Sequence, residues 1–379
     1  MVNSNHHKGS TNQTQKYLLF SFIFLLFGLT QGLLAAPQTI SLMAYNLENM
    51  FDATNDGVLQ GDVTFLPLSV KKKWKEDKCL VKEAFRRPLC ETLDWTQEKY
   101  EARLAKVVQV LLSYGNNGAD IISLEELENK NVTEDLWSKY LKWRGYQHPI
   151  HFESPSERGI DVAIISRFPL ASSPIAHHVD LSGVDAGSTR DVLEATFQVG
   201  SGELLKVAAN HWPSQNHTVE ARIRAANVVK SIALKAQGEG ASFISMGDFN
   251  TLPSETPNPI ENYLADSNVK NLARPLVDLV DYLKGYPNFP HKGSHFYQGE
   301  WNPLDRIMVS KNMLQSSNRL RIDLASFGLH VPSYLLKTGP LTDPKTGEKK
   351  LYTFPYRFDF QTGEGYSDHL PVVVEILVK

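Results

Sequence analysis

Five polar clusters in the sequence lie at or beside the ends of apolar runs, and their residue types could bind a metal or move protons. The last cluster is Asp368-His369, a carboxylate beside an imidazole just before the apolar run 372–374. The other four clusters are Asn46 with Glu48, Glu125 with Glu126, Asn210 with His211, and Asp248 with Asn250. One such pair says little about chemistry. Because strand ends converge on one crevice in layered α/β folds, the five together predict one active site.

The side chains of these clusters are carboxylates, amides and imidazoles, without a thiolate among them. Such a donor set suits Mg²⁺ or Mn²⁺, which bind through one or two carboxylates, water and substrate phosphate. The sequence lacks the Gly-x-Ser-x-Gly motif of many serine hydrolases, and it also lacks a Walker-type phosphate loop. The pattern therefore predicts metal-assisted hydrolysis of a phosphate ester, in which a cation neutralises phosphoryl charge and a base orients water.

Apolar patterning predicts the elements that position these clusters. Strands are expected at 39–46, 120–126, 160–166, 205–211, 242–248, 304–310 and 370–378. A helix is expected from about Asp94, which lies at capping-box spacing from Gln97, to Gly115, and another at about 218–237. Helices alternate with strands in the middle of the chain, while elsewhere strands follow each other through loops. We therefore expect an α/β fold of packed sheets with helices outside.

The first 36 residues resemble a secretory signal. A leader with Lys8 and Lys16 precedes the apolar run 18–28, and small residues at 35–36 offer a cleavage site. The run is short for a membrane span, although a retained anchor and a buried helix are the alternatives. We expect a secreted or periplasmic protein that contacts the membrane only transiently through this segment, with residues 37–379 as one domain. Cleavage would change the net charge from −3 to −5, so no global basic field attracts nucleic acid.

A polar insertion is expected at about 53–94, and it contains both cysteines, Cys79 and Cys90. In an exported protein such a closely spaced pair predicts a local disulfide, with free surface thiols as the alternative. The basic residues around the cysteines are Lys71, Lys72, Lys73, Lys75, Lys78, Arg86 and Arg87. A solvated face and a contact with a polyanion are both compatible with them.

An ordered set of motifs resembles the endonuclease/exonuclease/phosphatase superfamily. The motifs are Tyr45-Asn46-Leu47-Glu48, 120–126, Asn210-His211-Trp212-Pro213-Ser214, Gly247-Asp248-Phe249-Asn250, Leu304-Asp305-Arg306-Ile307 and Ser367-Asp368-His369. The resemblance spans about residues 40–378. It implies a deoxyribonuclease-I-like fold, which is a four-layer α/β sandwich of two packed mixed sheets flanked by helices. It also implies phosphoester hydrolysis, but it is not specific to one substrate.

The same resemblance implies a role for each matching position. The metal ligands would be Glu126, Asn46, Asp368 and, as a further carboxylate, Glu48. The groups that handle protons would be His369, oriented by Asp305, and Asp248, with the identity of the base left open. The groups that contact phosphate would be Asn250, His211 and Arg190. A salt bridge from Arg190 to Asp191 or Glu194 is the alternative for that arginine.

Several neighbouring residues have less defined roles. Glu125 stands where many relatives carry glutamine, so a hydrogen-bonding role is as suitable as metal binding. Asp161 lies within an apolar run, which makes it a candidate buried functional carboxylate beside His151 and Arg158. Surface positions are expected for His177, His178, His291 and His295.

Nucleic acid is the expected substrate, and export favours degradation of extracellular polymer over genome repair. The aromatic residues near the predicted site are Trp212, Phe296, Tyr297 and Trp301, which could stack on bases or simply pack. A sphingomyelinase-like lipid phosphodiesterase would need an exposed apolar hairpin, for which 354–358 is the nearest candidate. A catalytically silent binding protein is the third hypothesis, and the intact Glu126 and His369 argue against it. The sequence indicates no obligate protein partner.

Overall fold

The computed structural model describes residues 38–56, 60–74, 79, 87–268, 270–271 and 273–379. The expected signal segment, 1–36, lies outside these residues. Pro37–Lys379 form one compact unit. Within the described part of the chain, no helix is long and apolar enough to cross a membrane.

The first of two mixed six-stranded sheets contains both ends of the described chain. Its strands, from edge to edge, are β13 (Leu320–Leu329), β16 (Val372–Val378), β1 (Gln38–Met50), β2 (Ile121–Leu127), β4 (Asp161–Ser166) and β3 (Ile150–His151). Strand β1 pairs in parallel with β2 and antiparallel with β16. The final strand thereby lies beside the first, which brings the C-terminal Asp-His cluster to the end of β1.

The second six-stranded sheet contains the middle of the chain. Its strands, in order, are β5 (Ile175–His177), β6 (Val192–Val199), β7 (Glu203–His211), β8 (Ser242–Asp248), β12 (Asp305–Ser310) and β9 (Leu276–Asp278). Strands β7 and β8 are parallel, and they place His211 directly opposite Asp248. Strand β12 runs antiparallel to β8, with Asp305 opposite Asp248. The register of these strands therefore brings three predicted site residues together, namely His211, Asp248 and Asp305.

The two sheets and the outer helices form four packed layers, which confirms the predicted architecture. Apolar side chains of both sheets belong to one buried cluster, to which helix α4 (Gln97–Ser113) also contributes. Helix α6 (Val219–Gly238) packs its alanine-rich face on the second sheet in another cluster. The remaining helices of this body are α5 (Lys130–Leu136), η3 (Trp137–Leu141), α7 (Pro259–Tyr263) and α8 (Leu279–Tyr282). Single 3-10 turns are η2 (Tyr114–Asn116), η4 (Lys142–Arg144), η5 (Lys311–Leu314) and η6 (Ser333–Leu335).

All seven predicted strands are present within about two residues of their expected bounds, except that β1 continues to Met50. Helix α4 is also present, but its predicted capping box is wrong. Thr96 is the N-cap and accepts a hydrogen bond from the Lys99 amide, whereas Asp94 accepts one from the Leu68 amide. Asp94 therefore fastens the insertion to the start of α4 instead of capping it.

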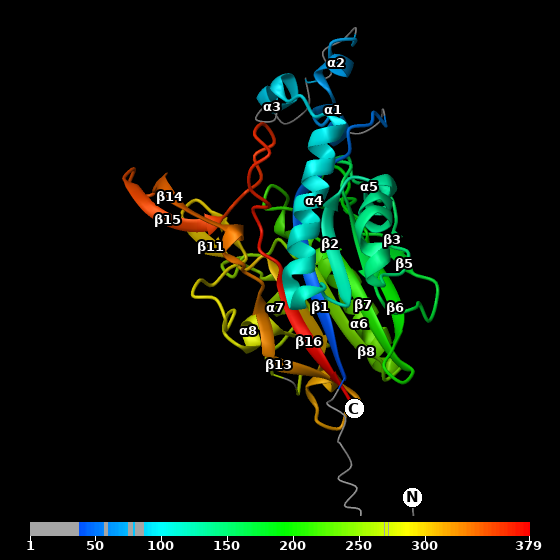
Figure 1. Ribbon diagram of the computed structural model, residues 1–379. Helices are drawn as coiled ribbons and strands as arrows, with labels where there is room; N and C mark the ends of the chain where they lie inside the picture. The colour runs from blue at the N-terminus through cyan, green and yellow to red at the C-terminus, as the bar shows by residue number, and fades with distance from the viewer. Residues whose placement is uncertain (1–37, 57–59, 75–78, 80–86, 269, 272) are drawn as a thin grey trace, which may run out of the picture. The chain divides into compact units, whose positions relative to one another are not determined.

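Two small hairpins stand outside the main sheets and were not predicted. One joins β10 (His295–Tyr297) to β11 (Glu300–Asn302), and the other joins β14 (Leu336–Thr342) to β15 (Lys349–Pro355). The β14–β15 hairpin projects from the body of the domain in Figure 1. The two hairpins meet through Phe296, which packs against Tyr352 and Phe354.

The insertion contains the short helices α1 (Gln60–Thr64), α2 (Leu68–Lys71) and α3 (Arg87–Thr92). The predicted Cys79–Cys90 disulfide is present. Lys71 does not belong to a solvated face, because its buried ammonium donates to the carbonyls of Thr64, Cys90 and Leu93 at 2.6–2.9 Å. Lys75, Lys78 and Arg86 lie outside the described residues. The disulfide and Lys71 together tie the middle of the insertion to its C-terminal part.

Candidate active site

The predicted polar clusters converge on one cleft of about 710 Å³ at the ends of strands from both sheets. Six of the predicted site residues line it, namely Glu126, His211, Asp248, Asn250, Asp368 and His369. Asn46 and Asp305 lie buried beneath them. The convergence of strand ends that the sequence predicted is therefore present in the structure.

Asp248, at the end of β8, is at the centre of the cleft. Its Oδ2 accepts hydrogen bonds from the side-chain amides of Asn46 and Asn250, both at 3.1 Å. The same oxygen lies 3.8 Å from Nε2 of His211 and 4.0 Å from Nε2 of His369. Burial, reinforced by the charge of Asp305, raises the pKa of Asp248, although the His369 charge opposes this shift. A carboxylate with a raised pKa and two oriented amides is suited to accept a proton.

His369 is oriented by a buried carboxylate, as the resemblance implied. Its Nδ1 lies 2.7 Å from Oδ2 of Asp305, and that oxygen also accepts a hydrogen bond from Ser294 Oγ at 2.6 Å. Burial by itself lowers the pKa of His369, but the carboxylates of Asp305, Asp368 and Asp248 outweigh burial and raise it well above its ordinary value. The imidazole is therefore held as a cation whose free Nε2 is directed toward Asp248 and Asp368.

His211, at the end of β7, is in the opposite protonation state. Burial and the nearby charges of Arg190 and Arg158 lower the pKa of His211 well below its ordinary value. Its Nε2 lies 3.6 Å from Glu126 Oε1, and its Nδ1 has no hydrogen-bond partner among the described residues. The cleft thus holds one neutral and one charged imidazole, a separation typical of sites that give each titratable group a different task.

Glu126 reaches the cleft through an irregularity in β2. The pairing of β2 with both neighbouring strands shifts at this residue, and Glu126 has a left-handed φ of 64°. Such backbone is costly for a residue with a side chain, and bulges of this kind redirect side chains near active sites. The Glu126 carboxylate accepts a hydrogen bond from the Asn49 amide at 2.9 Å and also lines the cleft. The bulge therefore lets Glu126 line the cleft, whereas its neighbour Glu125 stays buried.

The oxygen donors of the cleft fit a hard divalent cation. Glu126 and Asp368 both line it, and their side chains are 12% and 21% exposed, so each can offer oxygen to an ion. Asn46 contributes less directly, because its Oδ1 already accepts a hydrogen bond from the Glu48 amide at 3.0 Å. Glu126 and Asp368 are consequently the residues that would hold Mg²⁺ or Mn²⁺.

Glu48 is placed differently from the other predicted ligands. Its carboxylate accepts hydrogen bonds from the side chain of Arg357 and from the backbone amides of Phe358 and Asp368. It lines a separate cavity of about 250 Å³ beside Phe65. These contacts show that the Glu48 carboxylate fastens the loop that precedes Asp368, and its role as a metal ligand stays a prediction.

Arg190 is buried, and its side chain forms hydrogen bonds with the backbone. Its guanidinium donates to the carbonyls of His211 at 3.1 Å and Trp212 at 2.6 Å, and burial lowers the pKa of Arg190 to about 10. The alternative salt bridges are wrong, because Asp191 pairs with His178 and Glu194 pairs with His177 and Lys206. The side chain does not line the cleft. Arg190 therefore orients the segment that carries His211.

Two other arginines reach the cleft, and sequence reasoning assigned a phosphate-binding role to neither. Arg158 lies 2.8 Å from Asn49 Oδ1 and 3.7 Å from Glu126 Oε2, and Arg357 lies 3.7 Å from Asp368 Oδ2. The loop before Arg158 is held by buried Asp161, which accepts from the Ser154 amide at 3.0 Å. Asp161 is thus a buried carboxylate that positions a loop. The only feature of the sequence that indicated a role for Asp161 was a charged residue within an apolar run.

Glu125 is buried under the site and does not face the cleft. Burial raises the pKa of Glu125 well above its ordinary value, and its Oε1 accepts a hydrogen bond from Ser123 Oγ. A Cβ at Gly247 would lie 2.9 Å from this oxygen and 2.2 Å from the carbonyl oxygen of Asn210. Because Gly247 also has a φ of 131°, only glycine allows β8 to approach Glu125 so closely.

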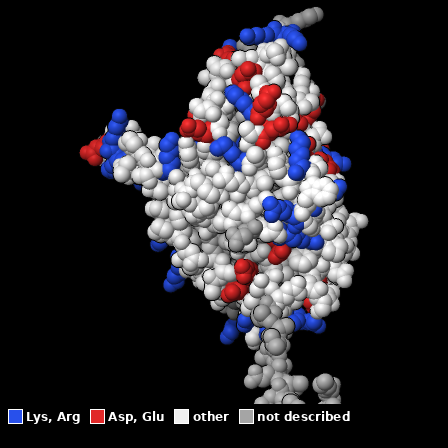
Figure 2. Space-filling view, in the orientation of Figure 1, with Lys and Arg blue, Asp and Glu red and all other residues white. Residues whose placement is uncertain are grey.

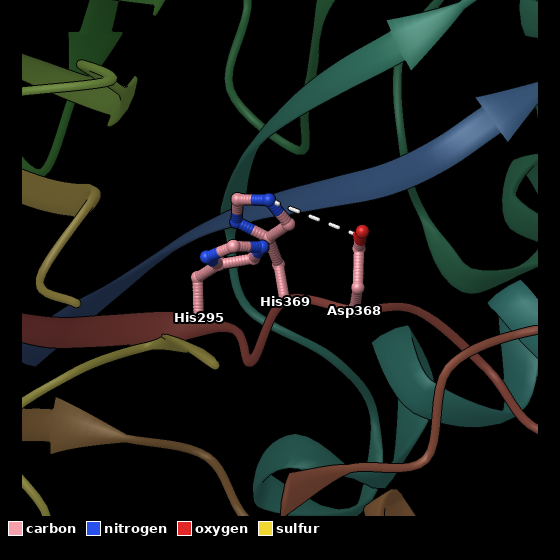
Figure 3. A group of neighbouring side chains, drawn as sticks. All are labelled: His295, Asp368 and His369. Atoms are coloured by element: carbon pink, nitrogen blue, oxygen red, sulfur yellow. Dashed lines mark ion pairs between the residues drawn. The ribbon is translucent and has the colours of Figure 1, made fainter. Parts of the chain in front are cut away.

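Several predictions for aromatic and histidine side chains need correction. Trp212 is fully buried against Phe249, and Trp301 stacks on His291. Tyr297 is the predicted stacking residue that remains open, since it lines the cleft and is 61% exposed. His295 is not a surface residue, because it lines the cleft and its ring lies 4.6 Å from that of His369 (Figure 3). The isolated His295–His369 backbone bridge, which no local pattern predicts, places it there.

The sequence model of the Endonuclease/Exonuclease/phosphatase family matches residues 80–378, so the chain belongs to this family. Its members are phosphoester hydrolases that typically depend on divalent metal ions. The sequence matches none of the curated proteins.

Three solved structures have a similar fold. An endonuclease/exonuclease/phosphatase family protein from Bacteroides thetaiotaomicron is 15% identical, with a TM-score of 0.47 over 91% of this chain and 99% of that one. The catalytic domain of human Nocturnin is 17% identical, with a TM-score of 0.48 over 91% and 97%. TDP2 of D. rerio, complexed with single-strand DNA product, is 15% identical, with a TM-score of 0.46 over 90% and 99%.

Proposed function

We propose that the protein is an exported, divalent-metal-dependent phosphodiesterase that hydrolyses nucleic acid, either DNA, RNA or both. The observation that supports this best is the position of Asp248, which lies within 4.0 Å of both imidazoles in a cleft that also contains Glu126 and Asp368. These groups provide a proton acceptor, a cationic imidazole, a neutral imidazole and two oxygen ligands in one place.

Each residue has a task in hydrolysis that follows from its surroundings. A divalent ion held by Glu126 and Asp368 would supply neutralisation of charge on the phosphoryl group. Asp248, with its raised pKa, accepts a proton from the attacking water while the Asn46 and Asn250 amides fix its orientation.

The two histidines then act on phosphate oxygens. The charged imidazole of His369, fixed by Asp305, stabilises negative charge and can donate a proton from Nε2 to the leaving oxygen. His211 remains neutral and can donate one hydrogen bond to a non-bridging oxygen. In this proposal Asp248 is the base and His369 is the acid, which assigns the role that the sequence left open.

The side chains at the rim of the cleft support nucleic acid as the substrate. Arg158 and Arg357 lie beside the proposed metal ligands and can pair with phosphates, while exposed Tyr297 offers a ring to a base. On the face drawn in Figure 2, acidic and basic side chains are interspersed without a broad basic field. Binding is therefore expected to depend on these local contacts, and to weaken as salt rises.

A lipid phosphodiester is the second candidate because the β14–β15 hairpin presents apolar side chains to solvent. Leu351 is 73% exposed, and Leu341 is also exposed, opposite Lys350 in the hairpin. The segment named from sequence, 354–358, is not the relevant one, since Phe354 stacks on Phe296 and Phe358 is buried. An exposed apolar hairpin beside the cleft could contact a lipid surface.

The direct test offers plasmid DNA, RNA and sphingomyelin vesicles to the purified protein with Mg²⁺, alongside an EDTA control. Glu126→Ala is the inactive variant, and Glu261→Ala, at an exposed position of α7, is the matched control. The proposal is supported if the wild type and the control cleave nucleic acid in a metal-dependent way and the Glu126→Ala variant does not. If only sphingomyelin is cleaved, the protein is a lipid phosphodiesterase. If the folded protein hydrolyses none of the three substrates, the result supports the hypothesis of a catalytically silent binding protein.

Export is tested separately by fractionating the producing cells and sequencing the N-terminus of the recovered protein. A mature chain that begins near residue 37 outside the cytoplasm supports export. A cytoplasmic chain that retains residues 1–36 refutes it, without affecting the assignment of the cleft.

A further inference from the structure

Two imidazoles and a carboxylate meet on one side of the cleft, in the cluster of His295, Asp368 and His369 shown in Figure 3. We propose that these three residues form a binding site for a borderline transition cation, with Zn²⁺ as the typical occupant. Its ligand chemistry differs from that of the oxygen donors assigned to Mg²⁺ or Mn²⁺. Imidazole with carboxylate favours Zn²⁺ and Co²⁺, whereas Mg²⁺ prefers oxygen throughout.

The distances among the three residues are close to those that a small cation requires. One ligand atom from each residue lies within 4.8 Å of the other two, and Nε2 of His369 is 3.8 Å from Oδ1 of Asp368. Around a tetrahedral zinc with bonds of about 2.0–2.2 Å, neighbouring ligand atoms lie roughly 3.3 Å apart. Small side-chain rotations would therefore bring the three ligand atoms together.

His369 is already oriented as a metal-binding histidine would be. Its Nδ1 is occupied by Asp305 at 2.7 Å, so its remaining nitrogen is directed to the cleft. A carboxylate behind the far nitrogen is the usual support of a histidine that binds a metal. Ser294 holds that carboxylate in turn at 2.6 Å.

His295 is held next to His369 by the backbone. An isolated antiparallel bridge joins the two residues, and the Leu370 amide donates to the Ser294 carbonyl at 2.9 Å. The two rings lie 4.6 Å apart at an angle of 37°. His295 is therefore presented to the cleft by a short, fixed connection that does not depend on a flexible loop.

The His295 ring also has a buried nitrogen without a protein partner. Its Nδ1 has no hydrogen-bond partner among the described residues. A buried polar atom without a partner is costly, and an ordered water or an ion at Nδ1 would each remove that cost.

The proposed zinc site shares Asp368 with the proposed magnesium site and occupies Nε2 of His369. Zinc bound there would displace the Nε2 proton of His369 into solvent and leave no proton for the leaving oxygen, so we expect zinc to inhibit the enzyme. This consequence rests on the proposed function, whereas binding of the cation itself does not.

Binding is tested with Co²⁺ and Zn²⁺ on the purified protein, prepared without a histidine tag. His295→Phe removes the nitrogens and keeps a ring, and His295→Asn removes the imidazole in a smaller form. His291→Phe is the matched control, because His291 stacks on Trp301 outside the cluster. In the wild type and the control, we expect the visible absorption of Co²⁺ that is bound by nitrogen ligands at a low coordination number. Both His295 variants should lose this absorption and bind Zn²⁺ at least about tenfold more weakly.

Equal Zn²⁺ affinity in the wild type and both His295 variants would overturn the proposal. The activity arm compares zinc inhibition of Mg²⁺-supported hydrolysis, and His295→Phe should need about tenfold more zinc for half-inhibition. Identical inhibition of wild type and variant would place zinc at the magnesium ligands and refute the site. If no phosphoester is hydrolysed, the proposed function fails, while the Co²⁺ titration still decides whether the cluster binds metal.

Discussion

Replacing Asp305 with asparagine tests the orientation and charge of His369 with little change in side-chain shape. Oδ2 of Asp305 accepts from both His369 and Ser294, while Oδ1 has no hydrogen-bond partner among the described residues. The amide oxygen of the introduced asparagine would have to replace Oδ2, which leaves its NH₂ group buried in the place of Oδ1. An unpaired buried donor costs roughly 1–3 kcal/mol, so the free energy of unfolding should fall by about that amount.

The pH dependence of this loss has a defined sign. The pKa of His369 is raised in the folded protein, chiefly by Asp305 acting against burial. Its contribution to stability is therefore full below the unfolded pKa of about 6.5, and it disappears as pH rises through the folded pKa. Removing the Asp305 charge lowers the folded pKa of His369. The stability difference between wild type and Asp305→Asn should consequently be largest in acid and shrink in alkaline solution.

Activity should fall much more than stability. If His369 donates a proton in hydrolysis, we expect the kcat of Asp305→Asn to drop by about 10²–10⁴-fold, and the alkaline limb of its pH–rate profile to move to lower pH. Urea unfolding at several pH values and steady-state kinetics measure the two effects.

Asp278→Asn is the matched control, because Asp278 is equally buried but pairs with Arg306 away from the cleft. This variant should lose stability and keep its pH–rate profile. The reasoning is refuted if Asp305→Asn retains wild-type kcat with an unchanged pH–rate profile.

Three further predictions concern the insertion, the cleft rim and the buried Trp212. Cys79→Ser with Cys90→Ser should lower the free energy of unfolding by roughly 3 kcal/mol, because the bond closes a loop of 11-residue separation; equal urea midpoints with and without the bond would contradict this. Tyr297→Ala should weaken single-stranded nucleic acid binding by about 1–3 kcal/mol in a fluorescence titration and leave thermal stability unchanged. Trp212→Phe should show the reverse, with about 1 kcal/mol of stability lost through the hydrogen bond to Asn210 and unchanged binding.

Local pattern was sufficient to predict seven of the twelve strands of the two main sheets, helices α4 and α6, and most of the cleft. Apolar runs located all seven strands that were named, and the polar residues at their ends included Glu126, Asp248 and His369. These predictions succeeded because a strand buried by sheets and helices requires continuous apolar residues, and because its polar ends have to leave the core. The disulfide was predictable for a different local reason, because its two cysteines lie close in sequence.

The hairpins were less predictable. Strands β10 and β11 have only three residues each, and most residues of β14 and β15 are exposed or half-buried, so the apolar patterns of all four strands are weak. Their packing depends on contacts such as Phe296 with Phe354, which are distant in sequence. Short hairpins are marginal by themselves and form where the rest of the protein supports them.

The sequence by itself determined which chemical groups the cleft contains, because each strand brings its own terminal residues. The tertiary structure alone decided where three other side chains act. Arg190 bonds to backbone carbonyls, Glu48 fastens the loop before Asp368, and His295 reaches the cleft through a bridge to His369, far along the chain. Each of these outcomes depends on a contact between distant segments, which forms only when strand register brings them together. A local pattern carries no information about such contacts, so these roles could be read only from the folded protein.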